Sequence, residues 1–353
     1  MIVPRTAARA LGVCALAGAA ALTVACRASA PLPVEAQGDA RSASVEVPPP
    51  LPLQGTAYDA AGLVPLPEVP PGNYPGLHNV YRLSGTILSG SEPIDEEALA
   101  QLAAWGVKTI LSVDGKVPDS EGAAREGLRY VHVPIQYKGI DDDQIARIAK
   151  TFRELEGPFY VHCFHGRHRG PAAAAIGRVA VDGLSRDRAI AEMRQWCSTA
   201  QKYEGLYATV ATADIPTAAE TEAYEFDFTA AHAFGGFREA MVAMARISNE
   251  LDLVRDNDWR PDPAHPDVDP LQSATQLHQF LVACSEMDEM ATYPDSFAKW
   301  MDTCRNGSGE LVELLTECRA EKVEPESLYE RIDAVYDAVS QSCLDCHGDY
   351  RNR

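Results

Sequence analysis

The chain has 353 residues, 46% of them hydrophobic, and a formal net charge of −20 at pH 7. That length and composition allow a large buried core, and we expect two folded domains. The strong negative charge disfavours nucleic acid and anionic membrane surfaces as partners, because both would repel the chain.

Residues 1–25 are predicted to be an export signal peptide. Arg5 and Arg9 precede a run of small and apolar residues that is too short for a typical membrane span. Residues 22–26 resemble the end of a bacterial lipoprotein signal, and this resemblance implies a lipid anchor on Cys26. An ordinary cleaved signal is the alternative. With either signal we predict an exported, periplasmic protein.

Two stretches are rich in proline. Residues 26–76 contain prolines and small residues without a helical period, which predicts an extended, semi-stiff tether between the anchor and the first domain. Residues 256–270 are predicted to be a loop inside the last domain, because helical patterns flank them on both sides.

Residues 77–215 alternate between strand-like and helix-like segments. Short runs rich in apolar residues predict strands, and longer segments with a helical period predict helices. In chain order the segments are residues 95–105 (helix), 107–113 (strand), 130–135 (strand), 142–155 (helix), 159–162 (strand) and a helix that begins near Pro171. This alternation predicts an α/β domain with a mostly parallel sheet.

Residues 159–171 read FYVHCFHGRHRGP and place a cysteine and several basic residues between a strand and a helix. A strand–loop–helix turn directs backbone N–H groups and a helix N-terminus at an anion. The same donors, with Arg169, would stabilise a Cys163 thiolate, and the planar guanidinium suits the oxygens of a phosphoryl group. Gly166 allows the sharp turn.

The motif HCFHGRHR resembles the signature loop of cysteine-dependent protein tyrosine and dual-specificity phosphatases. The resemblance covers residues 79–207, with His162, Cys163, Gly166 and Arg169 on motif positions. It implies that Cys163 is the nucleophile and that Arg169 binds phosphate, with His162 in the catalytic set. The substrate would be a phosphorylated protein or a small phosphoester. The loop residues predicted to contact it are Phe164, His165, Gly166, Arg167 and His168. The alternatives are a sulfur-transfer loop and an inactive phosphate-binding module.

The sequence departs from this family at two positions. The family usually has Ser or Thr after the arginine, where Gly170 stands, and its general acid is an aspartate where this chain has Gln136 and Tyr137. The candidates for a displaced acid are Asp141, Asp142, Asp143 and Asp114. The first three equally fit an N-cap and first helical turn, and Asp114 equally fits a turn before a glycine.

Residues 219–353 are predicted to form an all-α four-helix bundle. Apolar residues recur at helical spacing in four segments, which are residues 222–254, 270–290, 294–319 and 326–350. The last segment contains Cys343-Leu-Asp-Cys346-His347, the attachment pattern of a covalent c-type haem. CLDCHGDYR resembles the cytochrome c′ family, which implies His347 as the proximal iron ligand and Arg351 near the haem propionates.

The sixth position of the haem iron is predicted to be open. Met241 and Met244 are candidate ligands on the first bundle helix and His232 is a third, but a methionine at helical spacing is more often part of a core. The other cysteines considered are Cys197, Cys284, Cys304 and Cys318, whose pairing the sequence does not determine. Cys284 and Cys304 could meet across an antiparallel helix pair.

Together these patterns predict a periplasmic phosphoester hydrolase with a cysteinyl-phosphate intermediate, fused to a haem domain for redox or gas sensing. A redox partner would then be expected. One alternative is an electron-transfer or gas-binding cytochrome whose α/β domain only binds an anion. Another is a redox sensor in which Cys163 is oxidised.

Overall fold

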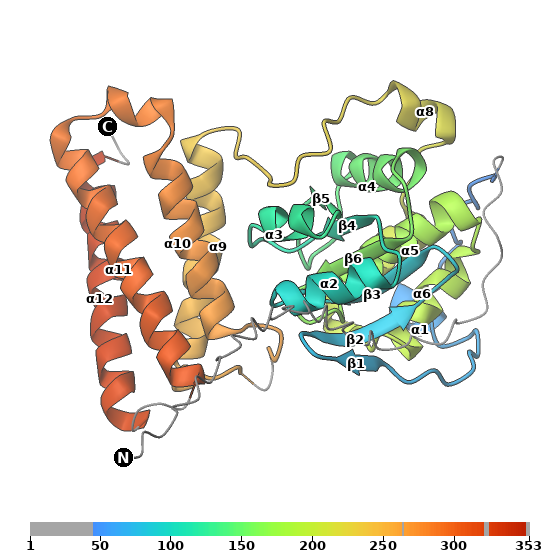
Figure 1. Cartoon of the computed structure of the whole chain (residues 1–353), viewed down its shortest axis with the longest axis horizontal. Helices are drawn as coiled ribbons and strands as arrows, with labels where there is room; N and C mark the ends of the chain where they lie inside the picture. Colours follow the sequence, from blue (N-terminus) through green and yellow to red (C-terminus); the bar gives the residue numbers. More distant parts are fainter. Residues whose placement is uncertain (1–44, 263–264, 321–324, 351–353) are drawn as a thin grey trace, which may run out of the picture.

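The computed structural model describes residues 45–262, 265–320 and 325–350. The predicted signal peptide, Cys26 and Arg351 lie outside these residues. Figure 1 shows an α/β part and a helical part, which lie side by side and are joined by a long connection after helix α8 (Ala218–Ala223). No helix among the described residues is long and apolar enough to cross a membrane.

The sheet of the α/β part has six strands in the order β1-β2-β3-β6-β4-β5. Their bounds are Gly72–Tyr74, Leu77–Arg82, Ile87–Ser91, Thr109–Ser112, Arg129–His132 and Phe159–Cys163 for β1 to β6. Strands β3, β6, β4 and β5 are parallel, whereas β1–β2 and β2–β3 are antiparallel. The sheet is therefore mixed rather than mostly parallel, because the links between the first strands are too short for parallel crossovers.

Helices cover both faces of this sheet (Figure 1). Alternate strand residues point to opposite faces, so Ile110 belongs to one apolar cluster and Leu111 to the other. Helices α2 (Glu96–Ala104) and α3 (Ser120–Arg125) contribute to the cluster of Ile110. The helices on the other cluster are α4 (Asp142–Glu154), α5 (Arg169–Gly177), α6 (Arg186–Gln195) and α7 (Glu204–Thr212).

Strand β6 lies in the centre of the sheet and is buried along its whole length. Its register pairs Cys163 with Ser91 of β3, and His162 with both Gly90 of β3 and Ser112 of β4. The carboxyl ends of three parallel strands therefore meet at one edge, which is where ligands bind in sheets of this kind. Cys163 is the last residue of the central strand.

The described part of the segment predicted to be a tether, residues 45–76, packs on the α/β part instead. The Leu51 N–H donates to the Ala211 carbonyl at 2.9 Å, and the Trp196 indole donates to the Pro67 carbonyl at 2.8 Å. Glu204 accepts the first N–H groups of α1 (Ala57–Ala60). The described residues of this segment therefore belong to the fold, because their scattered leucines and valines cover apolar surface that the helices leave open.

The helical part contains four long helices among the described residues. These are α9 (Phe237–Arg255), α10 (Pro270–Ser285), α11 (Asp295–Arg319) and α12 (Pro325–Tyr350). Three match the predicted segments closely, but the first begins at Phe237 rather than at residue 222. The preceding chain follows the edge strand β5 instead, where the His132 N–H donates to the Thr229 carbonyl at 2.9 Å.

A buried ion cluster behind α5 gives a test of the packing. Arg178 pairs with Asp182 at 2.7 Å and with Glu192 at 3.5 Å, and all three side chains are buried. We expect Arg178→Met to lower the free energy of unfolding by about 3–5 kcal/mol, because it removes the buried cation that pairs with Asp182 and leaves Glu192 with Arg188 alone. Denaturant unfolding of the full chain measures this loss.

Arg188→Met is the matched control. Arg188 also reaches Glu192, at 3.4 Å, but its side chain is 31% exposed. Its loss should cost less than about 1 kcal/mol. Equal losses in the two variants would contradict the role assigned to burial.

Candidate active site

The loop between β6 and α5 folds tightly against β3. Gly166 has a φ of +70°, and a Cβ there would lie 2.2 Å from the carbonyl carbon of Gly90. Only glycine meets both conditions. The predicted sharp turn at Gly166 is confirmed.

Cys163 and His162 end the central strand and are both buried. The His162 Nε2 lies 2.9 Å from the Tyr130 hydroxyl. Burial lowers the pKa of His162 to about 3, so the imidazole is neutral at physiological pH. His162 therefore supplies packing and a hydrogen bond beneath the nucleophile position rather than a positive charge.

Arg169 is the first residue of α5 and is almost fully buried. Its Nη2 donates to Asp114 Oδ2 at 2.6 Å, and its guanidinium lies over the Tyr137 ring, 4.4 Å from the centroid. The Nε has no hydrogen-bond partner among the described residues, although it is buried. A buried donor without a partner is rare, and here it belongs to the loop predicted to bind phosphate.

Asp114 follows β4 and is the anchor of this arginine. Its Oδ2 also accepts the Phe164 N–H at 3.1 Å, and its Oδ1 accepts the Lys116 N–H at 3.0 Å. Burial alone would raise the pKa of Asp114, but the Arg169 guanidinium and these two N–H groups outweigh it and lower the pKa to about 2. An ionised carboxylate has no proton to give at neutral pH. Asp114 therefore fits a positioning role and not that of the general acid.

The other predicted acids lie at the start of α4. The Asp141 side chain accepts the Gln144 N–H at 2.9 Å and forms a capping box with it. Asp143 pairs with Arg147 at 2.7 Å, and Asp142 is exposed in the same turn. These contacts match the N-cap and first-turn interpretation that the sequence left open.

The other residues of the loop between β6 and α5 differ in their burial and in their contacts. Phe164 and His165 are half-buried with their rings 4.5 Å apart, and the exposed Arg167 donates to Asn79 at 3.4 Å. His168 packs on Tyr203, and burial lowers its pKa to about 4. The basic cluster seen in the sequence therefore divides, with Arg169 inside, Arg167 on the surface and His168 neutral.

Two features of the site were missed or left unexplained by the sequence. Tyr137 occupies the region of the family's acid, yet it stacks on Tyr203 at 4.6 Å and supports Arg169. A Cβ at Gly170 would lie 3.0 Å from the Cys163 nitrogen, so a serine or threonine there would require the backbone to move. Helix α5 therefore packs closely on β6 at this position.

A hollow of about 530 Å³ lies where the α/β and helical parts meet. Phe164 and Gln272 are on its wall, so it opens beside the loop. On its wall Lys116 pairs with Glu92 at 2.6 Å, and Arg319 pairs with Asp269, which lies outside the wall.

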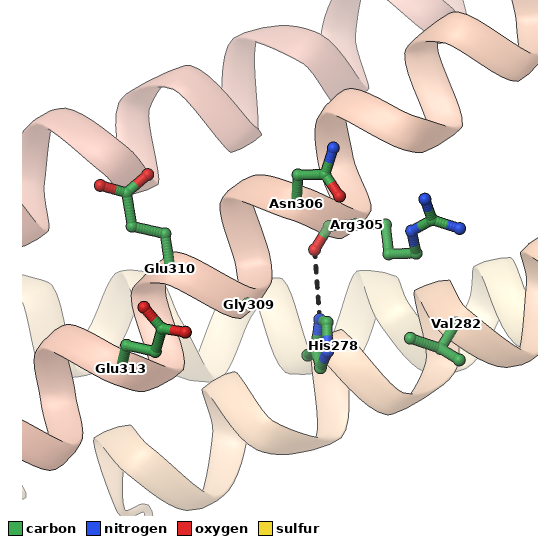
Figure 2. A pocket seen from close by; sticks show the side chains of 7 residues that line it. All are labelled: His278, Val282, Arg305, Asn306, Gly309, Glu310 and Glu313. Carbon is green, nitrogen blue, oxygen red and sulfur yellow. Dashed lines mark hydrogen bonds between the residues drawn. The ribbon is translucent and has the colours of Figure 1, made fainter.

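A second hollow, of about 610 Å³, lies between α10 and α11 (Figure 2). Its wall includes Glu310, Glu313 and His278, whose Nδ1 contacts the Arg305 carbonyl at 3.2 Å. Among the described residues, no three His, Cys, Asp or Glu side chains are arranged to hold a metal ion. The hollow between α10 and α11 therefore has no such metal-binding group among the described residues. The smaller hollow lies beside Phe164 of the loop between β6 and α5.

The residues predicted to hold haem lie on α12 and around it. Cys343, Cys346 and His347 are half-buried near its C-terminal end. Cys343 Sγ lies 3.8 Å from Cys304 Sγ, so the structure brings Cys304 to Cys343 rather than to Cys284.

The candidate sixth ligands are separated by the structure. Met244 is buried and Met241 half-buried on α9. His232 precedes α9, and its N–H donates to His132 Nδ1 of the α/β part at 3.0 Å.

Comparisons with known proteins agree on the α/β part. Residues 82–222 match the family described as "Swiss Army Knife protein, DSP-PTPase phosphatase domain". The dual specificity protein phosphatase TpbA of Pseudomonas aeruginosa strain UCBPP-PA14 is 30% identical over 119 residues, which are 33% of this chain and 54% of TpbA. The chain thus spans about half the length of this relative.

Two solved structures of TpbA are also similar to part of this chain. The crystal structure of P. aeruginosa TpbA is 27% identical and covers 41% of this chain and 90% of its own, with a TM-score of 0.35. The crystal structure of a TpbA variant in complex with pTyr is also 27% identical. It covers 39% of this chain and 85% of its own, with a TM-score of 0.34. With the motif and the loop geometry, the family match makes residues 82–222 similar to cysteine-dependent phosphatase domains of the dual-specificity type.

Proposed function

We propose that this chain hydrolyses phosphoesters through a phosphate ester of the Cys163 thiol. The observation that carries the proposal is the buried Arg169 Nε, which has no protein partner among the described residues and belongs to the same short loop as Cys163. Asp114 and Tyr137 hold the other sides of the guanidinium. The buried Nε is thereby left to donate to a phosphoryl oxygen.

The reaction follows from these positions. The Cys163 thiolate attacks phosphorus, an S–P bond forms, and the P–O bond to the leaving group breaks. Arg169 and the loop N–H groups bind the phosphoryl oxygens as their charge redistributes. Water then attacks the phosphorus, the S–P bond breaks, and inorganic phosphate leaves while the thiolate is regenerated.

The leaving group favours one class of substrate. Asp114 is ionised, and Asp141 and Asp143 are engaged at the start of α4. A phenolate departs with less protonation than an alkoxide does, so we propose phosphotyrosine and other aryl phosphates as the preferred substrates. The similarity to TpbA, whose name describes a dual specificity protein phosphatase, supports a phosphorylated protein as substrate.

We further propose that the helical part carries a covalent c-type haem. Two thiols one helical turn apart, followed by an imidazole, are the donor set of this group. Cys343 and Cys346 are half-buried against the helical core, and half-buried aromatic rings surround the same end of the bundle. The residues present therefore fit the group.

In this proposal Cys343 and Cys346 would hold the porphyrin and His347 would bind the iron, whereas Met244 belongs to the core. When bound, the group supplies redox or gas-binding chemistry and implies a redox partner. Export to the periplasm with a lipid anchor on Cys26 completes the proposal, and it rests on the pattern of residues 1–26 alone.

The nucleophile and the arginine can be tested by substitution. Cys163→Ser should abolish phosphate release from an aryl phosphate, because a hydroxyl is not ionised near neutral pH. Arg169→Lys should slow it roughly a hundredfold or more, because a point charge cannot replace the planar fork. Arg167→Lys, on the exposed side of the loop, is the control and should change the rate little. Full activity of Cys163→Ser would eliminate the mechanism.

The role of Asp114 is tested by its dependence on the leaving group. If Asp114 positions Arg169, then Asp114→Asn should slow aryl and alkyl phosphates by similar factors, because phosphate binding is impaired in both. A general acid would behave differently, since its loss spares substrates with good leaving groups. Rates measured over a series of leaving-group pKa values distinguish the two, and a much larger loss for alkyl substrates would overturn the positioning role.

The haem proposal has its own test. Protein produced in the periplasm together with the haem-attachment machinery should keep its colour on a denaturing gel. Cys343→Ala with Cys346→Ala should remove the colour, whereas Cys318→Ala should not. A colourless wild-type protein would refute this part of the proposal.

A further inference from the structure

Helix α10 presents three glutamines to the loop that follows β4 in the α/β part. Gln272, Gln276 and Gln279 follow the spacing that places side chains on one face of a helix, and we refer to them as the glutamine row. The first two donate to Asp114 Oδ1, at 2.8 and 3.3 Å. Gln279 Oε1 accepts the Val117 N–H at 3.0 Å.

The packing of this row is tight. Gln272 and Gln276 are both buried, with 7% and 9% of their surface exposed. Gly115 lies under Gln276, and a Cβ on Gly115 would be 2.6 Å from Gln276 Oε1. Near the start of α10, Lys202 pairs with Asp267 at 3.1 Å and forms a second link between the two parts. The helical part therefore contacts the site through buried side chains.

The hydrogen bonds to Asp114 divide between its two oxygens. Oδ2 accepts from the Phe164 N–H and from Arg169, whereas Oδ1 accepts from the Lys116 N–H and from the two glutamines. An amide donates without carrying charge, so it satisfies Oδ1 and does not compete with Arg169 for the carboxylate. The two glutamines thus fix which oxygen faces Arg169.

We propose that Gln272 and Gln276 make the helical part a component of the phosphate site, as positioning residues that act through Asp114 on Arg169. An effect of these glutamines on catalysis rests on the proposed phosphatase function, whereas their effect on phosphate binding does not. Without the two amides, Oδ1 keeps one donor in a buried setting. The carboxylate then turns, or Arg169 moves to satisfy it, and the Nε leaves the phosphate-binding direction.

The same helix offers a route for regulation of this site. The opposite face of α10 places Leu277, Leu281 and Cys284 in the helical core, which also contains Met244 and Cys304. A rearrangement of that core that shifts α10 would change the hydrogen bonds to Asp114 directly. Phosphate affinity would then report the state of the helical part.

The test uses the full chain and inorganic phosphate as the probe. Gln272→Leu with Gln276→Leu keeps the side-chain volume and removes both donors. Titration calorimetry should show phosphate binding weakened by roughly tenfold, the effect of losing hydrogen bonds to a charged group. Gln279→Leu, which belongs to the same row but does not touch Asp114, should weaken binding by less than about threefold.

Unchanged phosphate affinity in the double variant would overturn the inference, and so would an equal loss in Gln279→Leu. A wild-type protein that binds phosphate but hydrolyses no phosphoester would refute the proposed function. The phosphate affinities of wild type, the double variant and Gln279→Leu would still test the inference.

If the wild-type protein binds no phosphate, amide hydrogen exchange tests whether the glutamines position Asp114. The Phe164 N–H, which donates to Asp114 Oδ2, should exchange faster in the double variant than in wild type and Gln279→Leu. Equal exchange in all three proteins would also overturn the inference.

Discussion

The site depends on one buried ion pair, Asp114 with Arg169. It joins the loop after β4 to the first residue of α5 across the central strand. Burying two charges is costly and becomes tolerable only when the remaining hydrogen-bonding groups are satisfied. Here the carboxylate receives N–H groups from two backbone positions and two glutamines, and the guanidinium rests on Tyr137. The buried Nε, which has no partner among the described residues, is the nitrogen that our proposal assigns to phosphate.

This pair also relates the two parts of the chain. A phosphate loop needs a fixed arginine, and here part of that fixation comes from α10, outside the α/β part. The helical part would then be more than an appended haem carrier. In the account proposed here, the chemistry at Cys163 and the packing around α10 share one set of hydrogen bonds.

The sequence predicted the parts of the site that are local in the chain. Cys163 and Arg169 lie within one short strand–loop–helix segment, so a motif could identify both. The long helices were predictable from their apolar period, except where the first begins later than expected and the chain near Thr229 lies against the edge strand β5 instead. That exception depends on contact with the neighbouring sheet, and the apolar period of the segment carries no information about that contact.

Contacts between distant residues could not be predicted in this way. Asp114 is 55 residues from Arg169, and an aspartate before a glycine looks like an ordinary turn. The glutamines of α10 look like a solvated helix face, because amides are common on surfaces and carry no charge pattern. The described residues of the expected tether look extended in sequence, but Leu51 and its apolar neighbours have a surface to cover. In each case the sequence near the residue does not show which distant residue of the chain it contacts.

The most direct test of the central claim is detection of the covalent intermediate. The full-length protein would be mixed with an aryl phosphate, quenched in acid within one turnover and digested, and the peptide that contains Cys163 would be weighed by mass spectrometry. The account predicts one added phosphoryl group on Cys163, absent from Cys163→Ser and reduced in Arg169→Lys. Turnover without a phosphoryl group on Cys163, or with the group on another residue, would contradict it.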